Sequence, residues 1–349
     1  MKEIFPQRLK SARLMLGFSQ VELARHLDIS KQAISKYEKG MMLPESTLLL
    51  KMAKVLQQKP DFFLRTSSVS LANVEFRKRA KLKGKKLESL KAHISDVLER
   101  YLELENIMGI NPTFKNPIKN IPIQNMEDVE KSGLQLLKSW KLGLNPLPNI
   151  IELLEDHGIK IIEVDFENSF DGLSTWVQKN IPIIVVNKNF DVVRKRFTVL
   201  HELGHLLLQI PEDASYKEKE GYCNRFPGAF LMPDFVLKKE LGERRPHLSI
   251  NELVAIKEYY GISIAALVYR AKDLGIISEN VARNFWKRRS QDENLKKEIG
   301  YGKYEGKEES GRFLQLLYNA LAEEIISISK GAYLAKTSIH TIKNNLQLL

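Results

Sequence analysis

The chain has 349 residues, 43% of them hydrophobic, which is long enough for two or three domains that each bury a core. Its single cysteine, Cys223, excludes an internal disulfide and favours a reducing, cytoplasmic setting. We expect no signal peptide or membrane span, because the N-terminal residues contain no apolar core and no apolar run approaches about 18 residues.

The positive charge is concentrated at the N-terminal end. The formal net charge is +11, and residues 1–100 contain 21 of the 54 Lys and Arg but only 10 of the 43 Asp and Glu. The rest of the chain is therefore neutral overall. This asymmetry is typical of a nucleic-acid-binding region joined to further domains with a different role.

Residues 5–64 are predicted to form a group of short helices that contains a helix-turn-helix. The segment Ser19–Glu22 has the spacing of a capping box, which opens a helix. The segment Asp28–Ser30 is too short for anything but a tight turn, and its serine can cap a second helix over residues 31–38. Two helices of this length joined by such a turn form a helix-turn-helix.

The stretch from Gln7 to Leu64 resembles the Xre and phage-repressor family of DNA-binding domains. The resemblance includes RLKSARLMLGFSQVELARHLDISKQAISKYEKG and then LPESTLLLKMAKVL, so it covers the whole five-helix domain. Asp28 departs from the family, which usually has glycine in the turn, but aspartate tolerates the left-handed conformation better than most residues. The resemblance implies that the protein binds double-stranded operator DNA as a homodimer on two half-sites.

The family's recognition helix and the helix before it supply the candidate DNA-binding residues, which are Gln20, Lys31, Gln32, Ser35 and Lys36. Lysine fits the O6 and N7 edge of guanine, and glutamine fits N6 and N7 of adenine. Gln20 is expected to bond a phosphate or to support Gln32. The alternative is that these polar residues form only a solvated helix face.

Residues 67–125 are expected to form a connector that is first basic and helical and then rich in proline. Its basic side chains either contact flanking phosphates or form a solvated surface, and they are Arg77, Lys78, Arg79, Lys81, Lys83, Lys85 and Lys86. The stretch 111–125 contains three prolines and no helical period, which marks a domain boundary.

Residues 126–240 are predicted to mix helices with strands and to contain a metal site. The stretches 158–164 and 181–187 are short and rich in β-branched residues, as strands are. The helix that follows, over 191–209, contains the sequence HELGH at positions 201–205.

The two histidines of HELGH share one face of this helix because they are four residues apart. His201 and His205 can therefore present two imidazoles to one Zn²⁺ ion. Glu202 lies about 100° further around the helix and can serve as general base toward a water held by the zinc. The alternative is a core helix whose histidines only form hydrogen bonds.

A catalytic zinc site needs a third protein ligand. The metzincin pattern is excluded, because Leu208 stands where that pattern has glycine. Among the downstream carboxylates we favour Glu220, with Glu218 as second choice. A helix that starts at Glu220 would carry Asn224 on the same face, where it could accept the second imidazole N–H of a ligating histidine.

The region from Ile150 to Pro233 resembles the ImmA/IrrE family of zinc metallopeptidases. The resemblance includes DGLS at 171–174, HELGHLLL from position 201 and the stretch from Glu220 to the end of the region. It implies a site-specific endopeptidase that cuts transcriptional repressors, and some such proteins belong to toxin–antitoxin or phage-related loci. Pro227 departs from the family, which commonly has alanine there, and we expect it to bend its helix.

These features predict a multidomain fold that is mainly α with a small α+β part. We expect an Xre-type helix-turn-helix domain at 1–66, a basic helical connector at 67–125, a zincin-like peptidase domain with a small sheet at 126–240 and a helical region at 241–349. The predicted function is that of a DNA-binding zinc endopeptidase that cleaves a repressor or antitoxin. One alternative is a regulator whose zinc domain senses or binds a partner without cleaving. Another is one half of a toxin–antitoxin or phage-defence pair.

Overall fold

The computed structural model describes residues 3–65, 84–110, 113–178 and 180–346. The chain divides into two compact units, of which the first comprises Met1–Asn111 with Phe313–Leu349 and the second Pro112–Arg312. The described elements are mostly helices, with one small sheet, which confirms the predicted fold class. Among these described residues, no helix has both the length and the apolar character that crossing a membrane requires.

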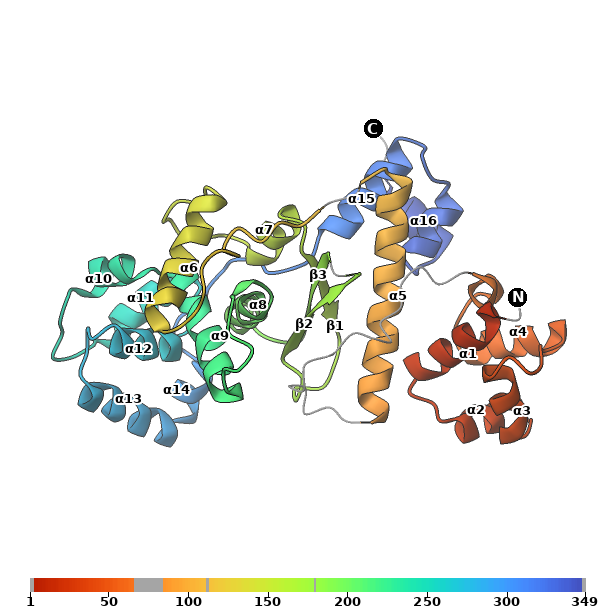
Figure 1. Cartoon of the computed structure of the whole chain (residues 1–349), viewed down its shortest axis with the longest axis horizontal. Coiled ribbons are helices and arrows are strands. Elements are labelled where there is room, and N and C mark those ends of the chain that lie inside the picture. The colour runs from red at the N-terminus through yellow and green to blue at the C-terminus, as the bar shows by residue number, and fades with distance from the viewer. Residues whose placement is uncertain (1–2, 66–83, 111–112, 179, 347–349) are drawn as a thin grey trace. The chain divides into compact units, whose positions relative to one another are not determined.

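The helix-turn-helix, α2 (Gln20–Leu27) and α3 (Lys31–Glu38), lies in the first unit (Figure 1). Both of its helices start where the sequence supplies caps. Ser19 caps α2 and takes part in the predicted capping box. Asp28 adopts the left-handed conformation that the turn needs, with φ 58° and ψ 46°. Ser30 then caps α3 by accepting the backbone N–H of the third helical residue.

Three further helical elements complete this domain, namely α1 (Ile4–Met15), α4 (Ser46–Val55) and the 3-10 helix η1 (Pro60–Leu64). Their apolar faces and those of α2 and α3 enclose one core, whose members include Phe5, Leu9, Leu23, Leu27, Ile34, Met52 and Phe63. The predicted five-helix domain is therefore present, with a 3-10 helix as its fifth element.

The rest of the first unit combines one long helix with the C-terminal helices, namely α5 (Lys85–Ile107), α15 (Arg312–Ala322), α16 (Ile328–Leu334) and α17 (Ile339–Asn345). Leu104 of α5 lies fully buried in one apolar core with Leu317 and Ala332. An ion pair of 2.6 Å between Arg8 and Glu99 joins α1 to α5. Segments far apart in sequence thus share one core.

The second unit contains a three-stranded sheet with the strand order β1-β3-β2. The central strand, β3 (Ile181–Asn187), pairs in parallel with β1 (Lys160–Val164) and antiparallel with β2 (Gly172–Val177). Six of its seven residues are buried, as expected for a strand covered on both faces. The strands predicted at 158–164 and 181–187 are present. The strand β2 was not predicted, because its sequence, GLSTWV, lacks a run of β-branched residues.

Helix α8 (Val192–Leu207) lies between this sheet and α9 (Tyr216–Leu231), as Figure 1 shows. Asp191 caps α8, as predicted, by accepting the backbone N–H of Arg194 at 2.9 Å. Twelve of the 16 residues of α8 are buried. The helix is therefore a core element and not an amphipathic surface helix.

The other helices of the second unit are α6 (Met126–Ser139), α7 (Ile150–Asp156), α10 (Asp234–Leu241), α11 (Ile250–Tyr260), α12 (Ile264–Asp273), α13 (Glu279–Gln291) and α14 (Glu293–Lys297). Helix α6 packs closely on α9, since a Cβ atom added to Gly133 would lie 2.9 Å from the carbonyl carbon of Ala229. Glycine at this position lets the two backbones approach each other.

Buried charges hold the non-helical segment 302–311 against α7 and α8. Glu308 is only 1% exposed and accepts a hydrogen bond of 2.5 Å from Arg196 Nη1. It also accepts the first two backbone N–H groups of α7, at 2.9 to 3.0 Å. The Nζ atom of Lys195 donates to the carbonyl oxygen of Glu308 at 2.9 Å. Two consecutive residues of α8 thus anchor this segment.

Candidate metal centre and DNA-binding helix

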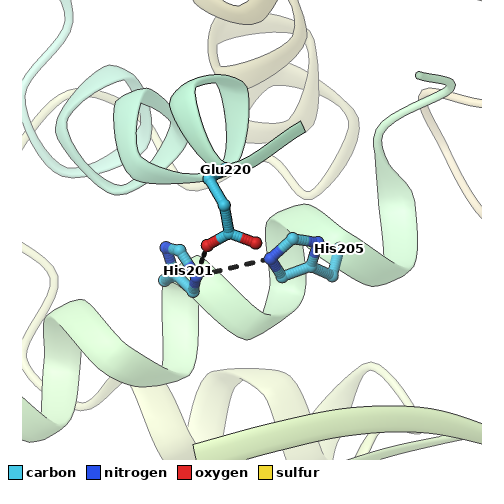
Figure 2. A group of neighbouring side chains, drawn as sticks. All are labelled: His201, His205 and Glu220. Carbon is cyan, nitrogen blue, oxygen red and sulfur yellow. Dashed lines mark hydrogen bonds and ion pairs between the residues drawn. The ribbon is translucent and has the colours of Figure 1, made fainter. Parts of the chain in front are cut away.

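The two histidines of HELGH and Glu220 converge at one point. Figure 2 shows Glu220 of α9 reaching toward both imidazoles on α8. The Nε2 atom of His201 is 3.3 Å from Nε2 of His205 and 3.8 Å from Oε2 of Glu220. All three candidate ligand atoms lie within 4.8 Å of one another. The structure thus brings together the three residues that the sequence analysis proposed as metal ligands.

The geometry and chemistry of this group fit a zinc ion. Two ligand atoms at about 2.0–2.1 Å from a tetrahedral metal lie roughly 3.3 Å apart. The separation of the two imidazole nitrogens, 3.3 Å, equals that distance. Two imidazoles and one carboxylate also form a donor set found in catalytic zinc sites, which leave the fourth position open.

Helix α9 begins four residues earlier than predicted, at Tyr216. Ser215 is its N-cap, and Glu218 closes a capping box by accepting the backbone N–H of Ser215 at 2.8 Å. These contacts with the Ser215 hydroxyl and backbone lower the pKa of Glu218. Glu218, the second-choice ligand, thus caps the helix and lies outside the three-residue group, whereas Glu220 lies on the next turn, toward α8.

Cys223, and not Asn224, lies beside a candidate ligand. Its Sγ atom is 3.0 Å from Nδ1 of His205, and the side chain is fully buried. Asn224 is exposed, and in the described part of the chain no hydrogen bond joins it to either histidine. Successive helical residues point about 100° apart. A shift of one residue in the expected rotation of the helix therefore changes which side chain faces the imidazole.

Glu202 contacts the sheet. It is 5% exposed and accepts a hydrogen bond of 2.7 Å from the Ser174 hydroxyl on β2. A Cβ atom on Gly172, two residues earlier on the strand, would lie 3.4 Å from Cγ of Glu202 and 2.9 Å from the carbonyl oxygen of Val185. Ser174 orients the carboxylate, and glycine at 172 lets β2 lie close to Val185 of β3 and to α8. Sequence reasoning included both residues in the DGLS resemblance but gave neither a role.

A carboxylate on α6 connects α9 to α12. Glu130 accepts hydrogen bonds from Arg225 of α9 at 2.5 Å and from Arg270 of α12 at 2.8 and 2.9 Å. Burial alone raises the pKa of Glu130, but the two guanidinium groups outweigh it, so the pKa lies below its ordinary value. These ion pairs hold the helix that carries Glu220.

The candidate recognition helix presents its polar residues to solvent. Lys31, Gln32 and Lys36 are exposed and Ser35 is half-buried. Within residues 3–65, 84–110, 113–178 and 180–346, none of these four side chains forms a hydrogen bond or ion pair. The opposite face of α3 is anchored in the core by Ile34 and Tyr37.

Gln20 supports α3, although not through Gln32. Its side-chain amide donates to Glu38 Oε2 at 2.8 Å. The same carboxylate accepts two hydrogen bonds from Arg13 of α1, at 2.6 and 3.0 Å. This cluster connects the start of α2 to the end of α3 and so fixes the angle between the two helices.

The predicted basic run is only partly described. Residues 77–83, with five of its seven basic side chains, lie outside the described residues. Lys85, at the start of α5, pairs with Glu22 of the capping box at 2.7 Å. The hydrogen bond from the Lys85 ammonium, followed by those with the Ser19 backbone and hydroxyl, lowers the pKa of Glu22 to about 2.

Comparisons with known proteins agree with both parts of this description. Residues 154–272 match the IrrE N-terminal-like domain family, and residues 9–63 match a helix-turn-helix family. Over 62 residues, 18% of this chain and 57% of the relative, the chain is 37% identical to the SPbeta prophage-derived uncharacterized HTH-type transcriptional regulator YonR of Bacillus subtilis strain 168. It is 34% identical to the HTH-type transcriptional regulator ImmR of the same strain over 67 residues, 19% of this chain and 53% of the relative.

The chain spans about half the length of the curated relatives it matches. The two family matches do not overlap, and each coincides with one of the sites described above. The chain therefore combines an Xre-type helix-turn-helix domain with an IrrE N-terminal-like domain.

Proposed function

We propose that the protein is a DNA-bound zinc endopeptidase that cleaves another protein, a transcriptional repressor or an antitoxin. The observation that carries the proposal is the convergence of His201, His205 and Glu220 next to the buried carboxylate of Glu202. The match of residues 154–272 to the IrrE N-terminal-like domain family supports it.

Each side chain at the centre has a separate role in this proposal. His201, His205 and Glu220 hold the ion, which when bound polarises a peptide carbonyl and makes a water molecule more acidic. Glu202 accepts the proton of the attacking water and returns it to the leaving amine. Ser174 donates to Oε2 of Glu202 and so fixes the direction in which the other carboxylate oxygen points.

The DNA-binding helix localises this activity. The exposed side chains of Lys31, Gln32 and Lys36 lie on a helix whose opposite face is buried, as base readout from the major groove requires. We propose that two copies bind two half-sites about 34 Å apart. A peptidase held on an operator meets the repressors that bind the same DNA.

The proposal is tested with the purified protein, zinc and the repressor or antitoxin encoded nearest to it. We expect wild type to cut that protein at one bond and Glu202→Gln to leave it intact while still binding one equivalent of zinc. The matched control is Glu218→Gln, which makes the same change at an exposed capping position. Equal cleavage by Glu202→Gln and wild type, or no cleavage by either, would contradict the peptidase proposal.

A regulator without turnover is the second candidate, because both curated relatives are named as HTH-type transcriptional regulators. In that case Glu202→Gln leaves expression from the target promoter unchanged, whereas Gln32→Ala with Lys36→Ala abolishes control. A reporter gene behind the chain's own promoter measures both effects. If Glu202→Gln fixes the reporter in one state, the regulator without turnover is excluded.

A further inference from the structure

The last two described helices repeat the capping pattern of the helix-turn-helix. Ser327 caps α16 by accepting the N–H of Lys330, and Ser338 caps α17 by accepting the N–H of Thr341. Ser327 and Ser338 are as far apart in sequence as Ser19 and Ser30, which cap α2 and α3. Both pairs of serines have extended backbone angles.

The turns between the two helices also have the same geometry. Lys336 has φ 52°, and Asp28, at the equivalent position of the first motif, has φ 58°. In both motifs, the backbone N–H of the residue after this left-handed residue donates a hydrogen bond to a carbonyl of the first helix. The N–H of Thr337 donates to the carbonyl of Ala332 at 3.0 Å, as the N–H of Ile29 donates to that of Ala24 at 3.0 Å. The two corners are the same local structure built from different sequences.

Two pairs of equivalent residues are buried in both motifs. Ala24 and Ala332 occupy the same position and are both buried, which lets the two helices approach closely. Ile34 and Ile342, at the same position of the second helix, are 0% and 2% exposed. Capping, turn and packing therefore all identify α16–α17 as a helix-turn-helix. The family match at residues 9–63 does not include it.

A third helix pair shows that a turn of this kind can also be followed by a helix that is largely buried. In the second unit, α11 and α12 are joined by a turn with Gly261 in the left-handed conformation and Ser263 as N-cap. Five of the ten residues of α12 are buried, so that pair belongs to the core. In α17, Ile342 is the one buried residue of seven. Helix α17 thus resembles the candidate recognition helix α3 in its exposure as well as its geometry.

We propose that α16–α17 is a second DNA-binding helix-turn-helix, which contacts double-stranded DNA through the exposed face of α17. His340, Thr341, Lys343 and Asn344 lie on that face, and each can form hydrogen bonds with bases or phosphates. His340 and Asn344 occupy the positions that Gln32 and Lys36 hold in α3. Asparagine fits the N6 and N7 edge of adenine.

The charge of the motif is compatible with DNA. Helices α16 and α17 contain no acidic residue. Lys330 and Lys336 pair with Glu103 and Asp96 of α5. Across the described residues, Lys343 forms no ion pair, so its ammonium group can neutralise a phosphate. The proposal extends the DNA-binding part of the proposed function and is independent of the zinc site.

The test compares two double variants of the full chain. Lys343→Ala with Asn344→Ala removes the proposed contacts, and Asn284→Ala with Lys287→Ala removes the same residue types from the exposed surface of α13 in the second unit. Binding to a fluorescein-labelled random-sequence duplex is followed by anisotropy during a salt titration. We expect about tenfold weaker binding and a salt slope smaller by about one for the first variant. The control should bind like wild type, and an unchanged affinity and slope in both variants would overturn the proposal.

A second measurement does not depend on a loss of binding. Cys223 is fully buried, so a DNA-cleaving iron chelate can be attached selectively at Lys343→Cys, with Asn284→Cys as the control. We expect strand cleavage from position 343 and none from position 284. DNA that is bound but not cleaved from position 343 would overturn the proposal. Gln32→Ala with Lys36→Ala tests α3 on the same duplex, so failure of one motif is distinguished from failure of the other.

Discussion

Helices α8 and α3 both carry candidate functional residues, but one lies within the core and the other on the surface. In α8, 12 of 16 residues are buried, whereas in α3 two of eight are. The groups on α8 depend on Glu220, Ser174 and Glu308 from distant parts of the chain. Those on α3 depend mainly on the helix itself. Changes around α8 should therefore alter the stability of the second unit, and changes on α3 should be visible only when DNA is present.

The largest effect on stability should come from separating Arg196 and Glu308. Arg196→Met leaves a carboxylate buried without its cation, which should cost about 3–5 kcal/mol of unfolding free energy. Arg194→Met is the control, since its exposed pair with Asp171 should contribute about 0–1 kcal/mol. Urea denaturation measures both variants. If Arg196→Met lowers the unfolding free energy no more than Arg194→Met does, the stability of α8 does not depend on the segment 302–311.

A methyl group at Gly172 should have the next largest effect. Gly172→Ala would bring a Cβ atom to 2.9 Å from the carbonyl oxygen of Val185 and from Cγ2 of Thr198. The strand and α8 must then move apart, which should cost about 1–3 kcal/mol and displace Glu202. Gly311→Ala, where the added atom meets nothing within 4 Å, is the control. Equal thermal midpoints for the two variants would show that β2 does not constrain α8.

Acid should weaken the connection of α9 to α6 and α12. The pKa of Glu130 is lower in the folded protein than its ordinary value of 4.5, so its stabilisation is present above pH 4.5 and is lost as the pH falls through the folded value. Glu130→Gln should cost about 2 kcal/mol at neutral pH and flatten the acid limb of the stability curve. Thermal unfolding of wild type and variant between neutral and acidic pH checks this. Parallel curves would mean that another carboxylate controls the acid limb.

The smallest effect on stability should come from the exposed face of α3. Gln32→Ala and Lys36→Ala should each change the unfolding free energy by less than about 0.5 kcal/mol. Each should nevertheless weaken binding to specific DNA by about 1–3 kcal/mol. Lys54→Ala, an exposed lysine on α4, controls for the lost charge. If the α3 variants have a clearly lower unfolding free energy than wild type, or bind DNA as tightly as Lys54→Ala does, the proposed difference between α3 and α8 is wrong.

Local features of the fold could be predicted from sequence, because a cap acts within a few residues. The capping box at Ser19, the left-handed Asp28 and the cap at Asp191 are all present. HELGH on a helix fixes the spacing of its two histidines. Glu220 was favoured among the downstream carboxylates as the start of a second helix, whereas its distance from each histidine could not be predicted.

Features that depend on contacts between distant segments could not be predicted. Nothing in the sequence near Ser174 shows that its hydroxyl reaches Glu202. The sequence analysis placed Asn224 beside a ligating imidazole, but Cys223, one residue earlier on the helix, lies there. The start of α9 could have been predicted, because Ser215 and Glu218 have the spacing of a capping box. Pro227 lies inside α9 and does not end it, since the helix continues to Leu231.

The discontinuity of the first unit has a consequence for synthesis on the ribosome. The apolar core around Leu104 of α5 is completed by α15–α17, and the whole second unit lies between them in sequence. During translation, Leu104 and its neighbours on α5 therefore lack these partners until residues 112–312 have been made, whereas Ala92 can already pack on the N-terminal core. The segment that completes this core is thus synthesised after the second unit, although α5 is synthesised before it.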